Sequence, residues 1–133
     1  GLSNGHGTVR SGSGAIDDLP VTWAARIGAQ NGKTSPEELA AAAHASCFSM
    51  ALALRLGRHD LAPERLDVTA TVSLDDVDGR STVVSSALSV RARVRELDEV
   101  AFRAIVNEAA DLCPISRLFA GAEITVDATL EVS

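Results

Sequence analysis

The chain has 133 residues, 46% of them hydrophobic and 23% charged, which is an ordinary composition for a soluble globular protein. This length favours one domain over residues 1–133. The formal charge of −6 comes without a cluster of Lys and Arg, and aromatic residues make up only 3% of the chain. Proteins that bind single-stranded nucleic acid combine a basic groove with stacking aromatics. We therefore expect neither nucleic acid nor an anionic membrane as a partner.

The N-terminal residues, GLSNGHGTVRSGSG, have neither the basic region nor the apolar region of a signal peptide. The most apolar stretch, residues 39–54, is shorter than the roughly 20 residues that span a bilayer. We therefore expect a cytoplasmic protein, in a compartment where thiols are kept reduced. In that setting the two cysteines are either inert core residues or a reactive pair.

The start of the chain predicts short, loose elements. Residues 1–20 are rich in Gly and Ser and predict strand and turn. Residues 21–28 (VTWAARIG) predict a strand, and the segment AQNGKT that follows predicts a turn.

A long helix is the clearest element of the sequence. Ser35 is its expected cap, Pro36 suits the first helical position, and Glu38 completes a capping box. We expect Gly57 to stop the helix. Residues 39–54 carry no formal charge, so most of the helix surface must be buried, and a second subunit would supply the cover that one small sheet lacks.

Three later segments alternate apolar and polar residues with the period of a β-strand: 66–76, 81–95 and 123–132. The sequence DVDG at 76–79 predicts a hairpin turn between the first two of them.

A second helix is expected over 98–112, between the last two strands. Asp98 is its cap, and its predicted buried stripe consists of Phe102, Ile105, Val106, Ala109 and Leu112. Another helical turn begins at Pro114. The order of elements predicts an α+β fold with antiparallel sheets and two main helices on one face.

Cys47 lies within the long helix, where a cysteine is either a small core residue or a nucleophile. A thiolate in mid-helix gains nothing from the helix dipole, so a reactive Cys47 requires a nearby cation, and Arg26 in the preceding strand is the candidate. Cys113 lies where one helix ends and the next begins, so amide groups there can stabilise a thiolate. Its alternative is a core position. Two cysteines on two helices favour a redox couple.

His44 lies one turn before Cys47 and leaves two further alternatives open. It is the base of a Cys-His hydrolase or acyl-transferase, or it binds zinc together with Cys47 and Cys113. The zinc site lacks a fourth ligand, and the hydrolase lacks a recognisable oxyanion hole and an orienting carboxylate. We therefore expect His44 to pack or to hydrogen-bond near the thiols.

Glu37 is free to pair with Arg26, because Glu38 already serves the capping box. Ten residues of helix separate Glu37 from Cys47, about 15 Å, which is too far for one small site within a chain. Two copies of the helix that cross antiparallel near Ala42 bring Glu37 of one copy close to Cys47 of the other.

Two segments resemble the cysteine motifs of the OsmC/Ohr proteins, a family named for osmotic induction and organic hydroperoxide resistance. SPEELAAAAHASCFSMAL (35–52) resembles the first motif, in a form closer to the OsmC branch, and LCPISRLF (112–119) resembles the second. The likeness extends to VTATVSLD (68–75) and AEITVDATL (122–130). The family's additional N-terminal strand is missing or clipped here, and the stretch between Arg26 and the helix is about one residue longer than the family pattern.

The resemblance implies an intertwined homodimer, with the long helices packed at the two-fold axis, that reduces organic hydroperoxides to alcohols. Cys47 matches the peroxidatic cysteine and Cys113 the resolving cysteine. Arg26 matches the arginine that stabilises the thiolate, and Glu37 the carboxylate that holds this arginine. The implied reductant is a dithiol or a lipoylated protein, and neither a metal nor another cofactor is implied.

We expect the substrate to meet side chains near the thiols, mostly apolar, that favour bulky organic hydroperoxides: Leu39, His44, Phe48, Met50, Leu112 and Phe119. The non-enzyme alternative is a dimeric module that binds a small apolar ligand at its subunit interface, with both cysteines merely packed. That alternative predicts slow thiol alkylation and no Cys47–Cys113 disulfide after exposure to a hydroperoxide.

Overall fold

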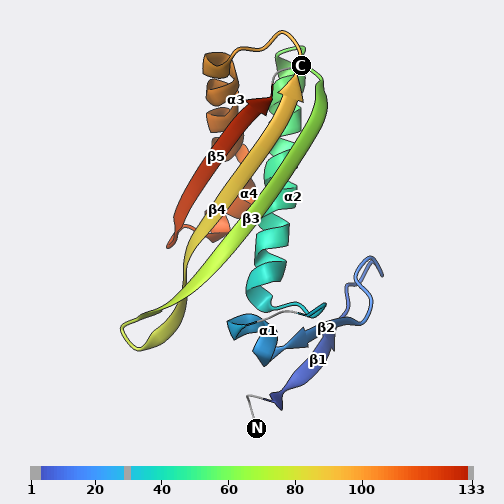
Figure 1. Ribbon diagram of the computed structural model, residues 1–133, viewed down its shortest axis with the longest axis vertical. Coiled ribbons are helices and arrows are strands. Elements are labelled where there is room, and N and C mark those ends of the chain that lie inside the picture. The colour runs from blue at the N-terminus through green and yellow to red at the C-terminus, as the bar shows by residue number, and fades with distance from the viewer. Residues whose placement is uncertain (1–3, 29–30, 132–133) are drawn as a thin grey trace. The chain divides into compact units, whose positions relative to one another are not determined.

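The computed structural model describes residues 4–28 and 31–131 (Figure 1). Its contacts divide the chain into two compact units, Gly1–Ala40 and Ala41–Ser133. The expectation of one domain over residues 1–133 stays a prediction.

The first unit begins with a small antiparallel hairpin. Strand β1 (His6–Val9) pairs with strand β2 (Leu19–Thr22), so that His6 lies opposite Thr22 and Val9 opposite Leu19. Arg10 donates a hydrogen bond to Asp18 across the connecting loop, at 2.7 Å. The expectation of strand and turn in this part of the chain is confirmed for the described residues.

Helix α1 (Trp23–Ile27) follows β2 directly, so the prediction of a strand over 21–28 is wrong beyond Thr22. Thr22 causes the change. Its backbone is extended, and its hydroxyl accepts a hydrogen bond from the amide of Ala25 at 3.0 Å, which caps the new helix. Two consecutive alanines favour the helical turn that follows. Arg26 therefore lies on a short helix and not within a strand.

Helix α2 (Pro36–Arg58) begins at the predicted residue. The hydroxyl of Ser35 accepts a hydrogen bond from the amide of Glu38 at 3.1 Å, which confirms the serine cap. The other half of the predicted capping box does not form, because the carboxylate of Glu38 accepts a hydrogen bond from the hydroxyl of Thr34 at 2.7 Å instead.

Helix α2 ends two residues later than the sequence predicted, since Gly57 was expected to stop it after Leu56. The helix continues through Gly57 and ends at Arg58. Asp60 supplies the left-handed backbone, with φ of 59°, and the amide of Leu61 then bonds the carbonyl of Leu56 at 2.9 Å. Since the aspartate makes the turn, Gly57 is not needed to stop the helix.

Helix α2 has 23 residues and is long and apolar enough to cross a membrane by length and composition. The expectation that this stretch is too short is therefore wrong on length. Core helices of soluble proteins pass the same test, and α2 contributes six buried residues to the protein: Ala41, His44, Phe48, Ala51, Leu52 and Leu56.

The second unit contains a three-stranded sheet in the order β3-β4-β5 (Figure 1). Strands β3 (Pro63–Val77) and β4 (Arg80–Val94) form the predicted antiparallel hairpin. Its turn has left-handed backbone at both central residues, with φ of 53° at Asp78 and 79° at Gly79, which is the geometry that matches the twist of two paired strands.

Strand β5 (Glu123–Glu131) pairs with β4 in parallel, whereas the sequence predicted antiparallel sheets. The reason is the connection: α3 (Glu99–Leu112) and α4 (Pro114–Leu118) return the chain across the sheet before β5 begins. The α+β class is confirmed, with a mixed sheet in this unit. The last residue of the predicted strand, 132, lies outside the described residues.

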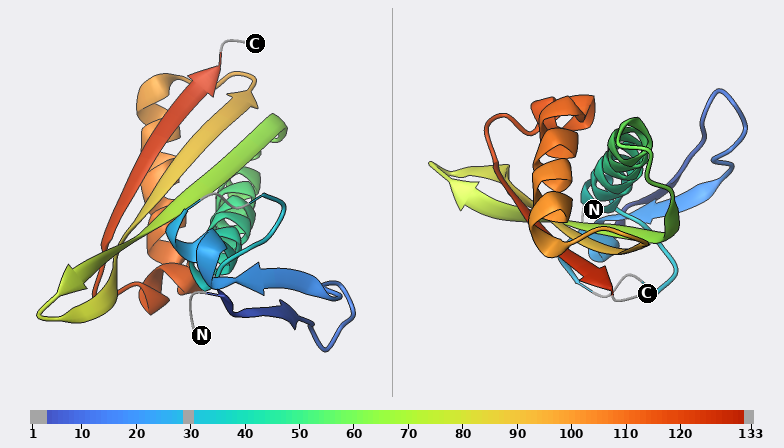
Figure 2. Two further views of the ribbon diagram at one scale, coloured as in Figure 1. Left: turned by 60° about the horizontal axis from the view of Figure 1, so that its bottom comes forward. Right: turned by 90° about the horizontal axis from the view of Figure 1, so that it is seen from above.

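The core of the second unit lies between the sheet and the two long helices, α2 and α3, which cover the same face of the sheet (Figure 2). The inward row of β4 consists of Leu88, Val90, Ala92 and Val94. It packs in one buried cluster with side chains of the helices, among them Phe48, Leu52, Leu56, Phe102, Ile105, Val106 and Ala109.

Helix α3 confirms the predicted cap, since the carboxylate of Asp98 accepts a hydrogen bond from the amide of Ala101 at 2.8 Å. Its predicted buried stripe is wrong at one position. Leu112 is 42% exposed, and Cys113, which follows Ala109 by four residues, takes the buried place instead.

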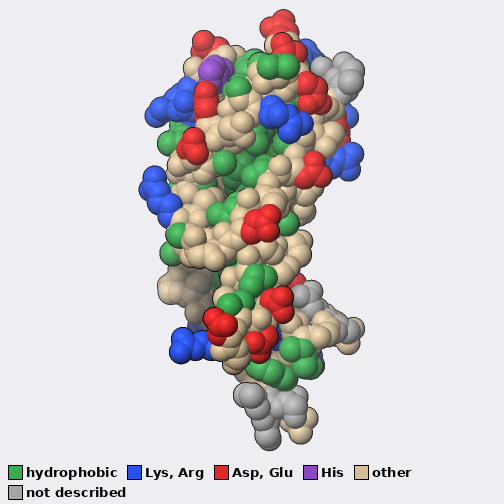
Figure 3. Space-filling view, turned by 90° about the vertical axis from the view of Figure 1, so that its left-hand side faces the viewer, with side chains coloured by type: hydrophobic (Ala, Val, Ile, Leu, Met, Phe, Trp, Pro, Cys, Tyr) green, Lys and Arg blue, Asp and Glu red, His purple; other side chains and the backbone are tan. Residues whose placement is uncertain are grey.

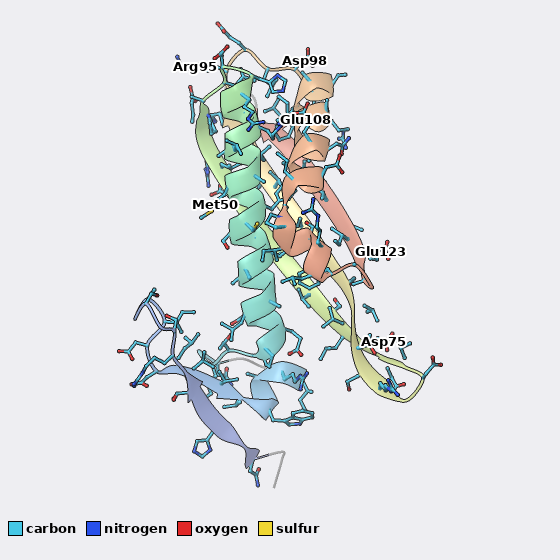
Figure 4. The ribbon with its side chains drawn as sticks, turned by 180° about the vertical axis from the view of Figure 1, so that it is seen from behind. Met50, Asp75, Arg95, Asp98, Glu108 and Glu123 are labelled. Atoms are coloured by element: carbon cyan, nitrogen blue, oxygen red, sulfur yellow. The ribbon has the colours of Figure 1, made fainter. Side chains whose placement is uncertain are left out.

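Charged residues of both signs are interspersed on the surface seen in Figure 3. One polar cluster links the two long helices. Glu108 of α3, labelled in Figure 4, accepts a hydrogen bond from Arg55 of α2 at 2.9 Å and also contacts His59. This contact adds a polar connection at the edge of the apolar core.

Candidate active site

Arg26 and Glu37 form an ion pair within the first unit, as the sequence predicted. The Nε and Nη2 atoms of Arg26 lie 2.9 Å and 2.7 Å from the same carboxylate oxygen of Glu37, Oε1. The guanidinium also lies over the ring of Trp23, 5.4 Å from its centroid. The side chains of Arg26 and Glu37 are 30% and 11% exposed. The arginine is therefore held from two directions while part of it still faces outward.

A surface pocket of about 300 Å³ lies beside this pair, between the β1-β2 hairpin and the first residue of α2. Trp23, Arg26 and Pro36 contribute to its wall. Sequence reasoning missed this pocket, because the folding of the hairpin assembles it from distant residues. The only signal was the single tryptophan of the chain, three residues before the candidate arginine.

Both cysteines are free thiols in the second unit, and each thiol shifts the pKa of the other. Cys47 is half-buried on α2, and Cys113 is buried between α3 and α4. Pro114 explains the position of Cys113, because the residue before a proline is excluded from helical backbone. Cys113 has φ of −66° and ψ of 109°, so α3 ends there and the thiol stays at the junction.

The two thiols have opposite electrostatic environments. Burial raises the pKa of Cys47, the neighbouring Cys113 raises it further, and a hydrogen bond from the amide of Ile115 opposes both. Burial also acts to raise the pKa of Cys113, but hydrogen bonds from the hydroxyl of Ser116, from Cys47 and from the amides of Ser116 and Ile115 outweigh it, so this pKa is lowered. Within this unit, Cys113 is the more readily ionised thiol.

His44 does not contact Cys47 as a catalytic base would. Its side chain is fully buried, Nδ1 lies 2.6 Å from the hydroxyl of Ser86, and Nε2 lies 2.9 Å from the hydroxyl of Ser116. The ring stacks on Phe119 at a centroid distance of 4.9 Å. Burial lowers the pKa of His44, which favours the neutral ring. The sequence prediction that His44 packs and hydrogen-bonds near the thiols is confirmed.

The zinc and hydrolase alternatives both need a ring nitrogen of His44 that is free to bind metal or to take a proton from Cys47. Serine hydroxyls occupy both nitrogens. Among residues 4–28 and 31–131, no group of three or more His, Cys, Asp or Glu side chains is placed to hold a metal ion.

The six residues predicted to line a substrate pocket differ widely in exposure. His44 and Phe48 are fully buried and Phe119 nearly so, whereas Leu112 is largely exposed. Met50, labelled on α2 in Figure 4, is 72% exposed. Leu39 is half-buried and belongs to the first unit. The assignment of these residues to a substrate pocket stays a prediction.

This chain belongs to the OsmC-like protein family, whose model matches residues 29–129. It is 41% identical over 130 residues to peroxiredoxin OsmC of Escherichia coli (strain K12), covering 98% of this chain and 90% of that protein. It is 33% identical over 133 residues to organic hydroperoxide resistance protein-like 1 of Staphylococcus saprophyticus, covering 99% of this chain and 90% of that protein.

A solved structure supports the same assignment. The organic hydroperoxide resistance protein OsmC of Legionella pneumophila superposes with a TM-score of 0.69 at 28% identity, covering 100% of this chain and 91% of that chain. The family and the OsmC-like fold predicted from the two cysteine motifs are confirmed, as is the closer likeness to OsmC. At the level of the family, these relatives support a peroxidase-type role.

Proposed function

We propose that this protein is a thiol-dependent peroxidase that reduces organic hydroperoxides to alcohols. The observation that carries the proposal is a pair of free thiols near the helix junction, close enough for each to shift the pKa of the other, in a family whose relatives are named peroxiredoxin and organic hydroperoxide resistance protein. Two thiols this close need little rearrangement to form a disulfide, and the helix junction provides amide donors to stabilise sulfur anions.

In the proposed reaction, the thiolate of Cys47 attacks the distal oxygen of the hydroperoxide. The O–O bond breaks, the alkoxide takes a proton to leave as the alcohol, and Cys47 becomes a sulfenic acid. Cys113 then attacks the Cys47 sulfur, which forms a disulfide and releases water. A dithiol, either a small molecule or a lipoylated protein, reopens the disulfide and becomes oxidised itself. The cycle requires no metal or other cofactor.

The pKa of Cys47 is raised, which indicates that the described part of the second unit supplies no cation to stabilise the Cys47 thiolate. Burial opposes the thiolate, so a peroxidatic Cys47 needs a cation. We assign this role to Arg26, because Glu37 and Trp23 hold its guanidinium in a defined orientation. Arg26 would also stabilise the negative charge that develops on the peroxide oxygen in the transition state.

A homodimer is part of the proposal. Only 28% of the most apolar window of α2 is buried within the chain, and Met50 and Leu54 are exposed on this helix. A second copy that crosses α2 near Ala42 would cover these side chains and bring Glu37 of one subunit toward Cys47 of the other, since ten residues of helix correspond to about 15 Å. Sedimentation analysis at micromolar concentration tests this directly, and a monomer would contradict it.

We place the protein in the cytoplasm, with no membrane or nucleic acid as a partner. Two free thiols suit a compartment that keeps thiols reduced. The net charge of −6 gives no general attraction to nucleic acid or to an anionic lipid surface.

Mass spectrometry of the reduced protein after one equivalent of cumene hydroperoxide tests the mechanism. We expect the wild type to lose two hydrogens through a Cys47–Cys113 bridge, and the Cys113→Ala variant to hold a trappable sulfenic acid on Cys47. The Cys47→Ser variant is the matched control and should leave the peroxide unconsumed. If both thiols of the wild type stay reduced while the peroxide persists, the non-catalytic binding module replaces this proposal.

A further inference from the structure

His44 belongs to a buried polar chain that packing alone does not require. Ser86 lies in the inward row of β4, which otherwise consists of the apolar residues Leu88, Val90, Ala92 and Val94. Ser86 and His44 are both fully buried, and they hydrogen-bond to each other at 2.6 Å. The second ring nitrogen bonds the hydroxyl of Ser116 at 2.9 Å, and this hydroxyl in turn lowers the pKa of Cys113. This series of polar groups (Ser86, His44 and Ser116) therefore leads from the core to Cys113.

The number of available protons fixes which group donates and which accepts in each hydrogen bond from Ser86 to Cys113. A neutral imidazole has one N–H donor and one acceptor nitrogen, and each hydroxyl has one proton to donate. When Ser116 donates its proton to the Cys113 thiolate, its oxygen is free to accept from Nε2–H of His44. Nδ1 of His44 must then accept the proton of Ser86. Each hydroxyl proton and each ring nitrogen has one partner in this arrangement, and all donors point toward the sulfur.

We propose that Ser86, His44 and Ser116 form a one-directional hydrogen-bond chain that stabilises the thiolate of Cys113 and prepares it to close the disulfide. This inference rests on the proposed function for the step in which Cys113 is used. In this proposal Ser116 donates its hydroxyl proton to the reacting sulfur, which makes it a catalytic residue in that step. His44 and Ser86 are positioning residues, because they act only through the orientation of the Ser116 hydroxyl.

The hydrogen-bond chain assists one step of the proposed reaction, the formation of the Cys47–Cys113 disulfide. The Cys113 thiolate donates an electron pair to the sulfur of the Cys47 sulfenic acid, the S–S bond forms and the S–O bond breaks. The departing hydroxide takes up a proton from solvent, which balances the proton that Cys113 released on ionisation, and the net product is water. His44 stays neutral throughout, so no charge has to be placed in the core.

Among the residues that the structure describes, only neutral donors lower the pKa of Cys113. In the described part of the chain, the groups that lower the pKa of Cys113 are Ser116, through both its hydroxyl and its amide, the amide of Ile115, and Cys47. No charged side chain of α2, β4 or α4 contributes to the shift among these residues. The loss of the Ser116 donor should therefore be measurable against a simple background.

The test measures the alkylation rate of Cys113 by iodoacetamide between pH 6 and 10 in a Cys47→Ser background, where Cys113 is the only thiol. We expect Ser116→Ala to reduce the thiolate fraction at neutral pH by about tenfold. The alkylation rate should fall about three- to fivefold, because a more basic thiolate is also more nucleophilic. His44→Phe should act in the same direction. His44→Gln and Ser116→Thr, which keep a donor or a hydroxyl, should restore part of the rate.

Ser89→Ala is the matched control, since Ser89 lies on the same strand as Ser86 but is exposed. Far-ultraviolet circular dichroism confirms that each variant is folded. If Ser116→Ala and His44→Phe titrate as Ser89→Ala does, the hydrogen-bond chain is refuted. The alkylation experiment uses no peroxide, so a negative result there refutes the hydrogen-bond chain without testing the proposed function. A failure of the proposed function would appear separately, as the absence of sulfenic acid in Cys113→Ala. With both thiols present, Ser116→Ala should slow disulfide closure at least threefold more than sulfenic acid formation, and equal slowing of the two steps would also refute the chain.

Discussion

Replacing Glu37 by glutamine removes the charge that holds Arg26 without changing the size of the side chain. Both contacting nitrogens of Arg26 bond Oε1 of Glu37, at 2.9 Å and 2.7 Å, and glutamine keeps an oxygen acceptor at that position. The second oxygen, Oε2, is buried without a hydrogen-bond partner among the described residues. The glutamine NH2 group would stand there without an acceptor. The substitution therefore weakens the ion pair and also leaves a buried donor unsatisfied.

The magnitude follows from the geometry and the exposure of this pair. A hydrogen bond to a charged group contributes about 1.5–3 kcal/mol to stability. Competition from water reduces this contribution when the groups are exposed. Arg26 is 30% exposed, so the low end of the range, about 1.5 kcal/mol, is the appropriate value. If this energy orients the guanidinium toward the Cys47 thiolate and the peroxide, its loss lowers kcat/KM for cumene hydroperoxide by about tenfold.

The matched control for Glu37→Gln is Glu38→Gln. The neighbouring carboxylate of Glu38 accepts a hydrogen bond from Thr34 and serves the helix start instead of Arg26. We expect Glu38→Gln to keep kcat/KM within about threefold of the wild type, because it loses one exposed charge. In an Arg26→Met background, Glu37→Gln should cost little further activity, since the two residues act as one unit. Equal losses in the two glutamine variants, or full activity in Glu37→Gln, would refute the proposed role of the pair.

Three further predictions concern stability, each measured by urea unfolding at fixed protein concentration. Phe48→Ala should destabilise the protein by about 3–5 kcal/mol, because the ring is fully buried, while Val100→Ala, at a position 82% exposed, should cost less than about 0.5 kcal/mol; similar losses would contradict the described core. Burial lowers the pKa of His44 below its ordinary 6.5, so the unfolded chain takes up this proton first as the pH falls. His44 should therefore leave the free energy of unfolding unchanged above pH 6.5 and should lower it as the pH falls below 6.5. The His44→Gln variant should show a smaller decline. If its free energy of unfolding falls with pH as steeply as that of the wild type, another group causes the decline. Asp98→Ala should cost about 1 kcal/mol through loss of the α3 cap, and Asp98→Asn should restore most of it; an alanine variant as stable as the wild type would refute the cap.

Local sequence signals predicted the elements of the second unit well. The alternation along β3, β4 and β5 matches the observed inward rows, and the aspartate cap of α3 and the turn at Asp78 and Gly79 were also correct. These features depend on residues close together in the sequence, so a short window contains their cause. In the first unit, one error occurred where two local preferences compete, at Thr22, which suits a strand and also caps a helix.

The two cysteine motifs were sufficient to identify the family, and the pairing of Glu37 with Arg26 was predicted from the free position of Glu37 at the helix start. Sequence reasoning did not predict that Ser86 and Ser116 hold His44. A serine within a strand carries no signal of its hydrogen-bond partner 42 positions away. Such a contact exists only after the sheet and helices pack together.

By itself, the sequence determined the long helices, the three strands of the second unit and most of the residues they bury, because capping, periodicity and proline geometry act over a few residues. Only the tertiary structure decided that β5 runs parallel to β4, that Cys113 and not Leu112 completes the buried face of α3, and that the two thiols lie close enough to shift each other's pKa. These outcomes depend on which surfaces meet when distant segments bury apolar area together, and burial is a property of the assembled core.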